Sequence, residues 1–168
     1  VTVFSCKTTN SEGFFMYKQA TELMLNFKDR ILIKGEEDTG KSTLLTEIRI
    51  SDSDSRYYNF KILNSAGYKQ LCDENIDNFD FLNTPEKTLI LDGVRLCEKK
   101  MTSKVIRLIK QARKYHKRLV VVADSCESEF IELLFDGVIA LSFNSDRERS
   151  CNVYTPSRCR NTDNIYAR

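Results

Sequence analysis

The sequence predicts an α/β fold in three layers, with a central, mostly parallel β-sheet between two layers of helices. Short apolar runs rich in β-branched residues alternate with longer stretches whose apolar residues recur every three or four positions. A glycine-containing loop, residues 35–43, joins the first of these runs to such a stretch. Strands that alternate with helices pair in parallel, because each helix crosses over a face of the sheet.

The first half of the chain contains four of the expected elements. Residues 13–28 place their apolar side chains along one helical stripe, whereas residues 30–34 form a short apolar run. The aromatic segment 57–63 stops shortly before Gly67, as a strand does when it runs into a loop. We therefore expect a helix over 13–28, a strand over 30–34, a helix that begins near residue 42 and a strand over 57–63.

The second half begins with a polar and acidic connector, residues 69–87, that has room for one short helix. Three further apolar runs follow, and helical stretches separate them. We expect strands over 87–93, 118–124 and 137–143, helices over 99–117 and 127–135, and an antiparallel edge strand over 152–155.

Length and composition indicate one domain, residues 1–168, without a membrane segment. The chain has no run of about 18 apolar residues, and its start lacks the pattern of a signal peptide. Its six cysteines are scattered and it has one histidine, so the spacing of a zinc site is absent. We read the cysteines as free thiols in a reducing, intracellular compartment.

The loop has the pattern of a phosphate-binding loop. Its two glycines permit a close backbone approach that a side chain would block. Backbone N–H groups and the start of the next helix attract phosphate oxygens, the lysine reaches the terminal phosphates, and the serine hydroxyl binds Mg²⁺. The nucleotide-binding residues that this pattern predicts are Gly35, Glu36, Glu37, Asp38, Thr39, Gly40, Lys41, Ser42 and Thr43.

A second motif supplies the expected partner of Ser42 at the metal. Three apolar residues precede Asp92, which is the form of a Walker B strand whose carboxylate holds Mg²⁺. The Asn-Lys-x-Asp motif that recognises guanine is absent from the sequence. We therefore expect ATP and Mg²⁺ as cofactors, with Ser42 and Asp92 as the metal ligands.

The residue that would activate the attacking water is not evident. Many P-loop ATPases carry a glutamate directly after the Walker B aspartate, but this chain has Gly93. RecA-type proteins place it near the end of the second strand, where residues 63–68 contain no carboxylate. Glu74 is the nearest catalytic candidate. The sequence thus supports nucleotide binding better than fast hydrolysis.

A strongly basic segment, residues 95–118, contains ten basic residues and one acidic residue. One interpretation is a solvated helix face; the other is a surface for a polyanion, of which DNA or RNA is the leading candidate. The spacing predicts that five of the basic side chains share a face and contact nucleic acid. They are Lys100, Lys104, Arg107, Lys114 and Arg118.

The loop residues Gly35, Glu36, Thr39, Gly40 and Lys41 resemble the loop of RadA-type recombinases of the RecA superfamily. The run 135–141, followed by Arg147 and Arg149, is similar to the late strands of RecA-like and KaiC-like ATPases.

The resemblance implies a RecA-like fold over residues 25–155 and an ATP-binding, recombinase-paralogue subunit in DNA recombination or repair. It also implies another RecA-like subunit or recombinase as partner, at most weak DNA-dependent ATPase activity, and a nuclear location in a eukaryote. Residues 1–12 would dock on that partner or form an edge strand.

Two alternatives stay open beside the recombinase paralogue. One is another P-loop protein, such as an AAA-type or signalling ATPase or a nucleotide kinase. The other is a non-hydrolysing scaffold that a bound nucleotide stabilises. Residues 125–136 are too short for the long DNA-binding loop of recombinases, which favours an accessory role over a filament-forming enzyme.

Overall fold

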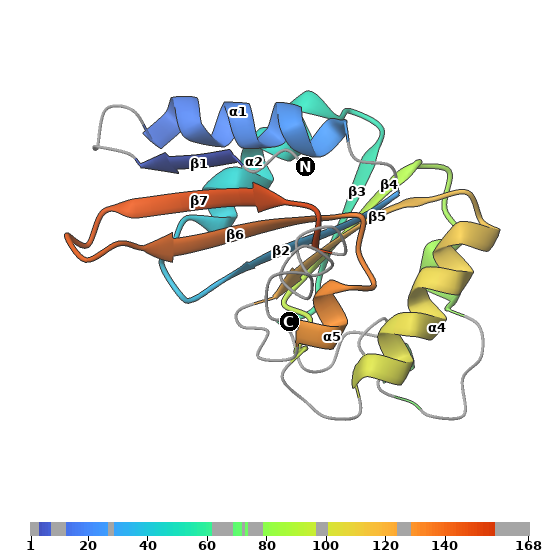
Figure 1. Ribbon diagram of the computed structural model, residues 1–168. Helices are drawn as coiled ribbons and strands as arrows, with labels where there is room; N and C mark the ends of the chain where they lie inside the picture. Colours follow the sequence, from blue (N-terminus) through green and yellow to red (C-terminus); the bar gives the residue numbers. More distant parts are fainter. Residues whose placement is uncertain are drawn as a thin grey trace.

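The computed structural model describes residues 4–7, 13–26, 29–61, 69–71, 73, 79–96, 101–123 and 129–156. Their strands form one seven-stranded sheet in the order β1-β7-β6-β2-β5-β4-β3, with helices on both faces (Figure 1). The strands are β1 (Phe4–Lys7), β2 (Arg30–Gly35), β3 (Ser55–Asn59), β4 (Thr88–Asp92), β5 (Arg118–Ala123), β6 (Gly137–Phe143) and β7 (Arg149–Tyr154). The helices are α1 (Gly13–Leu25), α2 (Lys41–Ser51), α4 (Met101–Lys114), α5 (Glu129–Glu132) and the 3₁₀ turn η1 (Asp80–Leu82).

The sheet is parallel through its centre and antiparallel at one edge. Strands β6, β2, β5, β4 and β3 pair in parallel, whereas β7 pairs antiparallel with β6 and β1 antiparallel with β7. Ile33 of β2 lies opposite Val122 of β5 on one side and Ile139 of β6 on the other. The predicted three-layer α/β fold with a mostly parallel sheet is therefore confirmed.

Two apolar layers flank the sheet, as the alternation of side chains along each strand requires. Ile31 and Ile33 of β2 belong to the layer that contains residues of α1 and α2, whereas Leu32 belongs to the layer that contains residues of α4. All three side chains are fully buried. Burial on both faces explains why the central strands read as continuous apolar runs in the sequence.

Helix α4 ends earlier than the sequence predicts. Lys117 donates its N–H to the carbonyl of Ala112 at 2.8 Å, and His116 donates to the carbonyl of Arg113 at 3.0 Å. His116 has a φ of 55°, so these two bonds close the helix in a Schellman motif. The next residue, Arg118, consequently belongs to β5 and not to the helix.

Two strands also differ from their expected bounds. β3 ends at Asn59, because Phe60 turns to donate its N–H to the carbonyl of Asp92 at 2.7 Å. β7 begins at Arg149 and is covered on its outer side by β1, so it is not the edge strand. Among the described residues, no helix is long and apolar enough to cross a membrane.

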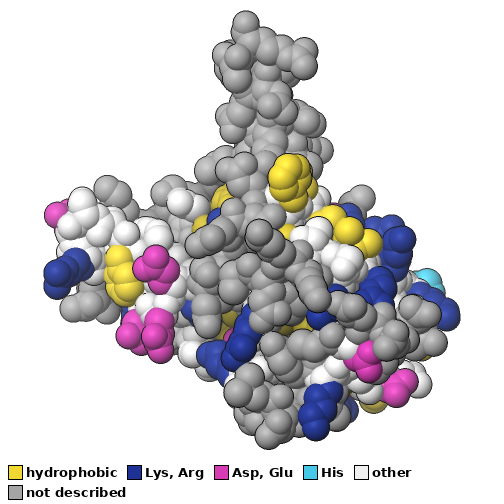
Figure 2. All heavy atoms as spheres, turned by 90° about the horizontal axis from the view of Figure 1, so that it is seen from below, with side chains coloured by type: hydrophobic (Ala, Val, Ile, Leu, Met, Phe, Trp, Pro, Cys, Tyr) yellow, Lys and Arg dark blue, Asp and Glu magenta, His cyan; other side chains and the backbone are white. Residues whose placement is uncertain are grey.

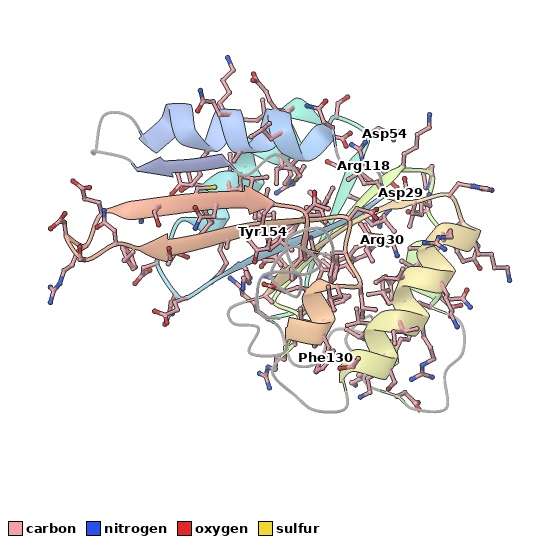
Figure 3. The ribbon with its side chains drawn as sticks, viewed as in Figure 1. Asp29, Arg30, Asp54, Arg118, Phe130 and Tyr154 are labelled. Carbon is pink, nitrogen blue, oxygen red and sulfur yellow. The ribbon has the colours of Figure 1, made fainter. Side chains whose placement is uncertain are left out.

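The start of the central strand is tied to the start of β6 by one carboxylate. Asp136 Oδ2 accepts the backbone N–H groups of Asp29 and Arg30, each at 3.1 Å, and Oδ1 pairs with the Arg30 guanidinium at 2.7 Å. Figure 3 shows Asp29 and Arg30 together at this end of the sheet. Burial alone would raise the pKa of Asp136, but the bonds from Arg30 and the backbone outweigh it and hold the pKa below its ordinary value.

We expect Asp136→Asn to lower the free energy of unfolding by about 1–3 kcal/mol at neutral pH, because charge-assisted bonds to Arg30 are lost. The folded pKa is depressed, so the wild-type advantage is complete above the unfolded pKa and disappears as the pH falls through the folded value. Urea unfolding of both proteins between pH 7 and pH 3 measures it. A difference that does not shrink below about pH 4 would contradict this account.

Candidate nucleotide-binding site

The predicted loop lies between β2 and α2, at the carboxyl end of the central strand. Asp38 and Gly40 have φ angles of 63° and 101°, which turn the chain sharply before Lys41 begins the helix. No side chain caps the N-terminus of α2. The start of the helix therefore points its N–H groups and the positive end of its dipole toward the loop, which favours an anion there.

Both glycines of the pattern are required by close packing. A Cβ on Gly35 would lie 2.6 Å from the carbonyl oxygen of Leu141 and 2.6 Å from Thr39 Oγ1. A Cβ on Gly40 would overlap the hydroxyl of Tyr17 in α1. Thr39 closes the loop by donating to the carbonyl of Glu36 at 2.7 Å. The loop is therefore a rigid shape, held between β6 and α1.

Lys41 folds back across the loop. Its ammonium group donates to the carbonyl of Gly35 and, at 2.8 Å, to that of Glu36. The residue is 8% exposed, so its charge is held near the centre of the loop by backbone dipoles. A phosphate group bound in the loop would contact the Lys41 ammonium at this position.

A cavity of about 510 Å³ opens beside the loop, within the usual size range of small-molecule sites. Two cationic side chains from elsewhere in the chain join the loop in lining it: Lys61 from the turn after β3, and Arg149 at the start of β7. Together with Lys41 they give three cations against the carboxylates of Glu37 and Asp38. The remaining residues that line the cavity are Gly40, Ser42 and Thr43.

The sequence offered a hint of Arg149, because this residue follows the run 135–141 that resembles the late strands of RecA-like proteins. Lys61 had no such signal, because the sequence placed it inside the strand expected over 57–63. Only the sheet order reveals that the turn after β3 lies beside Asp92.

Asp92 ends β4 next to the cavity but is 3% exposed. Its Oδ2 accepts the hydroxyl of Tyr57 at 2.5 Å and lies 3.8 Å from the Lys61 ammonium. Burial and the bond to Asp92 raise the pKa of Tyr57, which therefore remains a neutral donor. The aspartate is held in place by two side chains of one neighbouring segment.

Gly93 leaves no room for a carboxylate after Asp92. Its φ is 84°, and a Cβ there would lie 2.5 Å from Lys61 Cγ and 2.9 Å from the Lys61 backbone nitrogen. The stem of Lys61 thus fills the direction in which a side chain at position 93 would extend. Glycine at position 93 is therefore what allows Lys61 to pack at this point.

The residues of the site provide several features that suit a triphosphate, but only two candidate ligands for a metal ion. The uncapped helix, the packed glycines and the cations suit a triphosphate. The Ser42 hydroxyl and the Asp92 carboxylate are oxygen donors of the kind that Mg²⁺ prefers. Among the described residues, no group of three or more His, Cys, Asp or Glu side chains could hold a metal alone, so phosphates and water would complete the shell. Mg²⁺ stays a prediction.

The predicted basic face is not assembled as expected. Lys104 is 6% exposed and points into the protein, and Arg118 lies in β5, 4.0 Å from Asp52. Figure 3 shows Arg118 at the end of the sheet where Asp29 and Asp54 also lie. Arg107 is half-buried and Lys114 is exposed on α4. Lys100 and the catalytic candidate Glu74 lie outside the described residues.

Comparison with known proteins gives structural likeness only. No family model matches the chain, and no curated protein matches it. AMPPCP-bound DnaA from Aquifex aeolicus has a TM-score of 0.44 at 18% identity, over 71% of this chain and 40% of that one. Domain III of the Thermotoga maritima replication initiation protein DnaA has a TM-score of 0.45 at 19% identity, over 73% of this chain and 54% of that one.

A third structure, YdiB of Bacillus subtilis, has a TM-score of 0.45 at 12% identity, over 92% of this chain and 86% of that one. The chain thus spans about half the length of the DnaA structures or less. At these scores the likeness assigns no function, so the class rests on the chain's own geometry. Strand, glycine loop and helix follow one another in a mostly parallel sheet, and Asp92 lies at the same edge of that sheet, which is the arrangement that a phosphate-binding loop requires.

We expect Gly93→Glu to introduce no ATP hydrolysis and to lower the free energy of unfolding by about 1–3 kcal/mol, because position 93 has a positive φ and is filled by Lys61. Gly93→Ala should lower the free energy of unfolding by a similar amount. Because alanine adds no charge, that result would assign the loss to backbone strain and crowding. Thermal unfolding and a phosphate-release assay test both variants. A stable Gly93→Glu protein that hydrolyses ATP would show that the space is open.

Proposed function

We propose that this chain is an ATP-binding P-loop domain that works as a nucleotide-dependent switch with slow turnover. The observation that carries the proposal is the loop between β2 and α2: an uncapped helix N-terminus and a buried lysine beside a cavity with two further cations. A site with this charge and shape suits a polyphosphate chain better than an apolar or cationic ligand.

Each residue has a defined task in binding. Backbone N–H groups of the loop and of the first turn of α2 donate hydrogen bonds to the phosphate oxygens, and Lys41 turns from the loop carbonyls toward them. Arg149, which also lines the cavity, adds a second cation for the phosphates. Ser42 and Asp92 are the residues that would hold Mg²⁺, which neutralises phosphate charge when it is bound.

Slow turnover follows from the groups around Asp92. The position after it cannot carry a glutamate without strain. Among the described residues, the side chains that contact the Asp92 carboxylate are the Tyr57 hydroxyl and the Lys61 ammonium, and neither is a base that accepts a proton from water. Binding energy is then available for conformational change or assembly, not for repeated hydrolysis.

The narrower class has two candidates. The loop sequence supports a recombinase-paralogue subunit that acts in DNA recombination or repair beside another RecA-like subunit. The alternative is a P-loop ATPase of the AAA or signalling type, and the loop and cavity geometry supports it equally well. ATP-dependent capture of a purified RecA-like recombinase would favour the first candidate. Unchanged mobility of both proteins on mixing, with ATP present, would favour the second.

We expect Lys41→Ala to weaken ATP binding at least tenfold, because a charge-assisted bond to phosphate is removed. Isothermal titration with ATP measures the affinity. Lys87→Ala is the matched control, since this exposed lysine lies at the other end of β4. Equal affinities for Lys41→Ala and wild type would contradict the nucleotide site.

We also propose that the outer face of α4 binds nucleic acid. Of the basic residues that the sequence predicted for this role, only Lys114 belongs to the proposed surface. Lys110, Arg113 and Lys114 are exposed there, whereas Lys104 is buried. In the part of the chain that the structure describes, no carboxylate pairs with Lys110 or Lys114. Figure 2 shows basic side chains gathered beside the histidine, His116, which follows this helix. Lys110, Arg113 and Lys114 lie about one helical turn apart or less, and such a group of cations attracts a polyanion.

We expect Lys110→Glu/Lys114→Glu to weaken DNA binding about tenfold or more and to lower its salt dependence by about two released ions, since both lysines would contact phosphates. Fluorescence anisotropy over a range of salt concentrations provides both values. Lys18→Glu/Arg147→Glu reverses two exposed charges away from α4 and should change little. Equal losses in the two variants would indicate a general charge effect and no surface on α4.

A further inference from the structure

A lysine lies beside Asp92, the aspartate that the sequence predicts as a ligand of Mg²⁺. Lys61 lines the cavity, and its ammonium lies 3.8 Å from Asp92 Oδ2. In an ordinary P-loop site this neighbourhood receives the charge of Mg²⁺. Here the chain provides a positive charge of its own at the same carboxylate.

The backbone fixes where this lysine starts. Phe60 donates its N–H to the carbonyl of Asp92 at 2.7 Å, and Lys61 donates its N–H to Asn59 Oδ1 at 3.0 Å. The stem of the side chain packs over Gly93, which has no Cβ to displace it. The turn is thus attached to β4, while the side chain is still 49% exposed toward the cavity. A fixed base and a free end allow the ammonium to swing over a short distance.

We propose that Lys61 is a tethered cation of the nucleotide site, which pairs with Asp92 when the site is empty and with the terminal phosphate when a triphosphate is bound. The chain therefore binds a nucleoside triphosphate without Mg²⁺. This inference rests on the proposed nucleotide-binding function and adds to it the source of the neutralising charge.

Two features make the exchange of partners favourable. The terminal phosphate carries more negative charge than one carboxylate, so it attracts the ammonium more strongly. Asp92 does not lose its last partner when Lys61 leaves, because the Tyr57 hydroxyl donates to the same oxygen at 2.5 Å. A buried carboxylate without that donor would resist the change.

The competing account is that Lys61 only stabilises the fold by pairing with Asp92. Under that account its replacement would lower the unfolding temperature and leave the metal dependence of binding unchanged. Under the tethered-cation account its replacement creates a metal dependence that wild type lacks. The two accounts thus differ in a binding measurement that requires no hydrolysis.

The experiment compares ATP and ADP binding by isothermal titration in excess Mg²⁺ and in EDTA. We expect wild type to bind ATP with affinities that agree within about threefold in the two conditions. Lys61→Met keeps the stem over Gly93 but removes the charge, so it should lose about tenfold in EDTA and less in Mg²⁺. Lys61→Arg should behave as wild type, and Lys87→Met is the charge-matched control at the other end of β4. ADP should bind all variants alike, because it lacks the terminal phosphate.

Several results would overturn the inference. Wild type that loses more than tenfold in affinity on removal of Mg²⁺ needs the metal, and the inference then fails whatever the variants do. Lys61→Met that matches wild type in both conditions, while unfolding at a lower temperature, would assign the lysine a structural role. Wild type that binds no nucleotide in either condition would contradict the proposed function itself, a result distinct from the other two.

Discussion

The pairing of β2 with β5 on one side and β6 on the other is the constraint on which the site depends. Hydrogen bonds from both neighbours fix the direction in which β2 ends, and parallel pairing brings the ends of β4 and β3 to the same edge. The loop after Gly35, the carboxylate of Asp92 and the turn at Lys61 meet there without any direct link in sequence. A ligand at this edge lies where parallel α/β sheets generally bind their ligands.

Cationic side chains outnumber acidic ones around the cavity at this edge. Backbone dipoles hold Lys41 inside the loop, while Lys61 and Arg149 approach the cavity from two other segments. The carboxylates of Glu37 and Asp38 oppose them at the rim. Cations that converge from separate elements of a fold indicate a polyanionic ligand more strongly than a glycine loop does alone. The same arrangement places a cation, not a base, next to Asp92.

The sequence predicted the features that depend on residues close together in the chain. It missed the contacts between segments that only the order of strands in the sheet brings together. The loop and Asp92 sit in short patterns whose physical tasks depend on neighbours in the chain, and the alternation of apolar runs indicated the strands. Lys61 could not be found this way, since its relation to Asp92 requires that β3 pair with β4. The basic face failed for a different reason: helical spacing cannot tell that Lys104 points inward, nor that the bonds at Ala112 and Arg113 end α4 before Arg118.

The contact between Tyr17 and Gly40 couples the position of helix α1 to that of the loop. The tyrosine is buried against the glycine and donates to the carbonyl of Thr39 at 3.4 Å, so the loop cannot move outward unless α1 moves as well. Arg149, which lines the cavity, also interacts electrostatically with this hydroxyl. Helix α1 packs on both α2 and β7. A displacement of the loop would therefore act on α1 and, through it, on β7 at the antiparallel margin of the sheet, far from the strand that ends at Asp92.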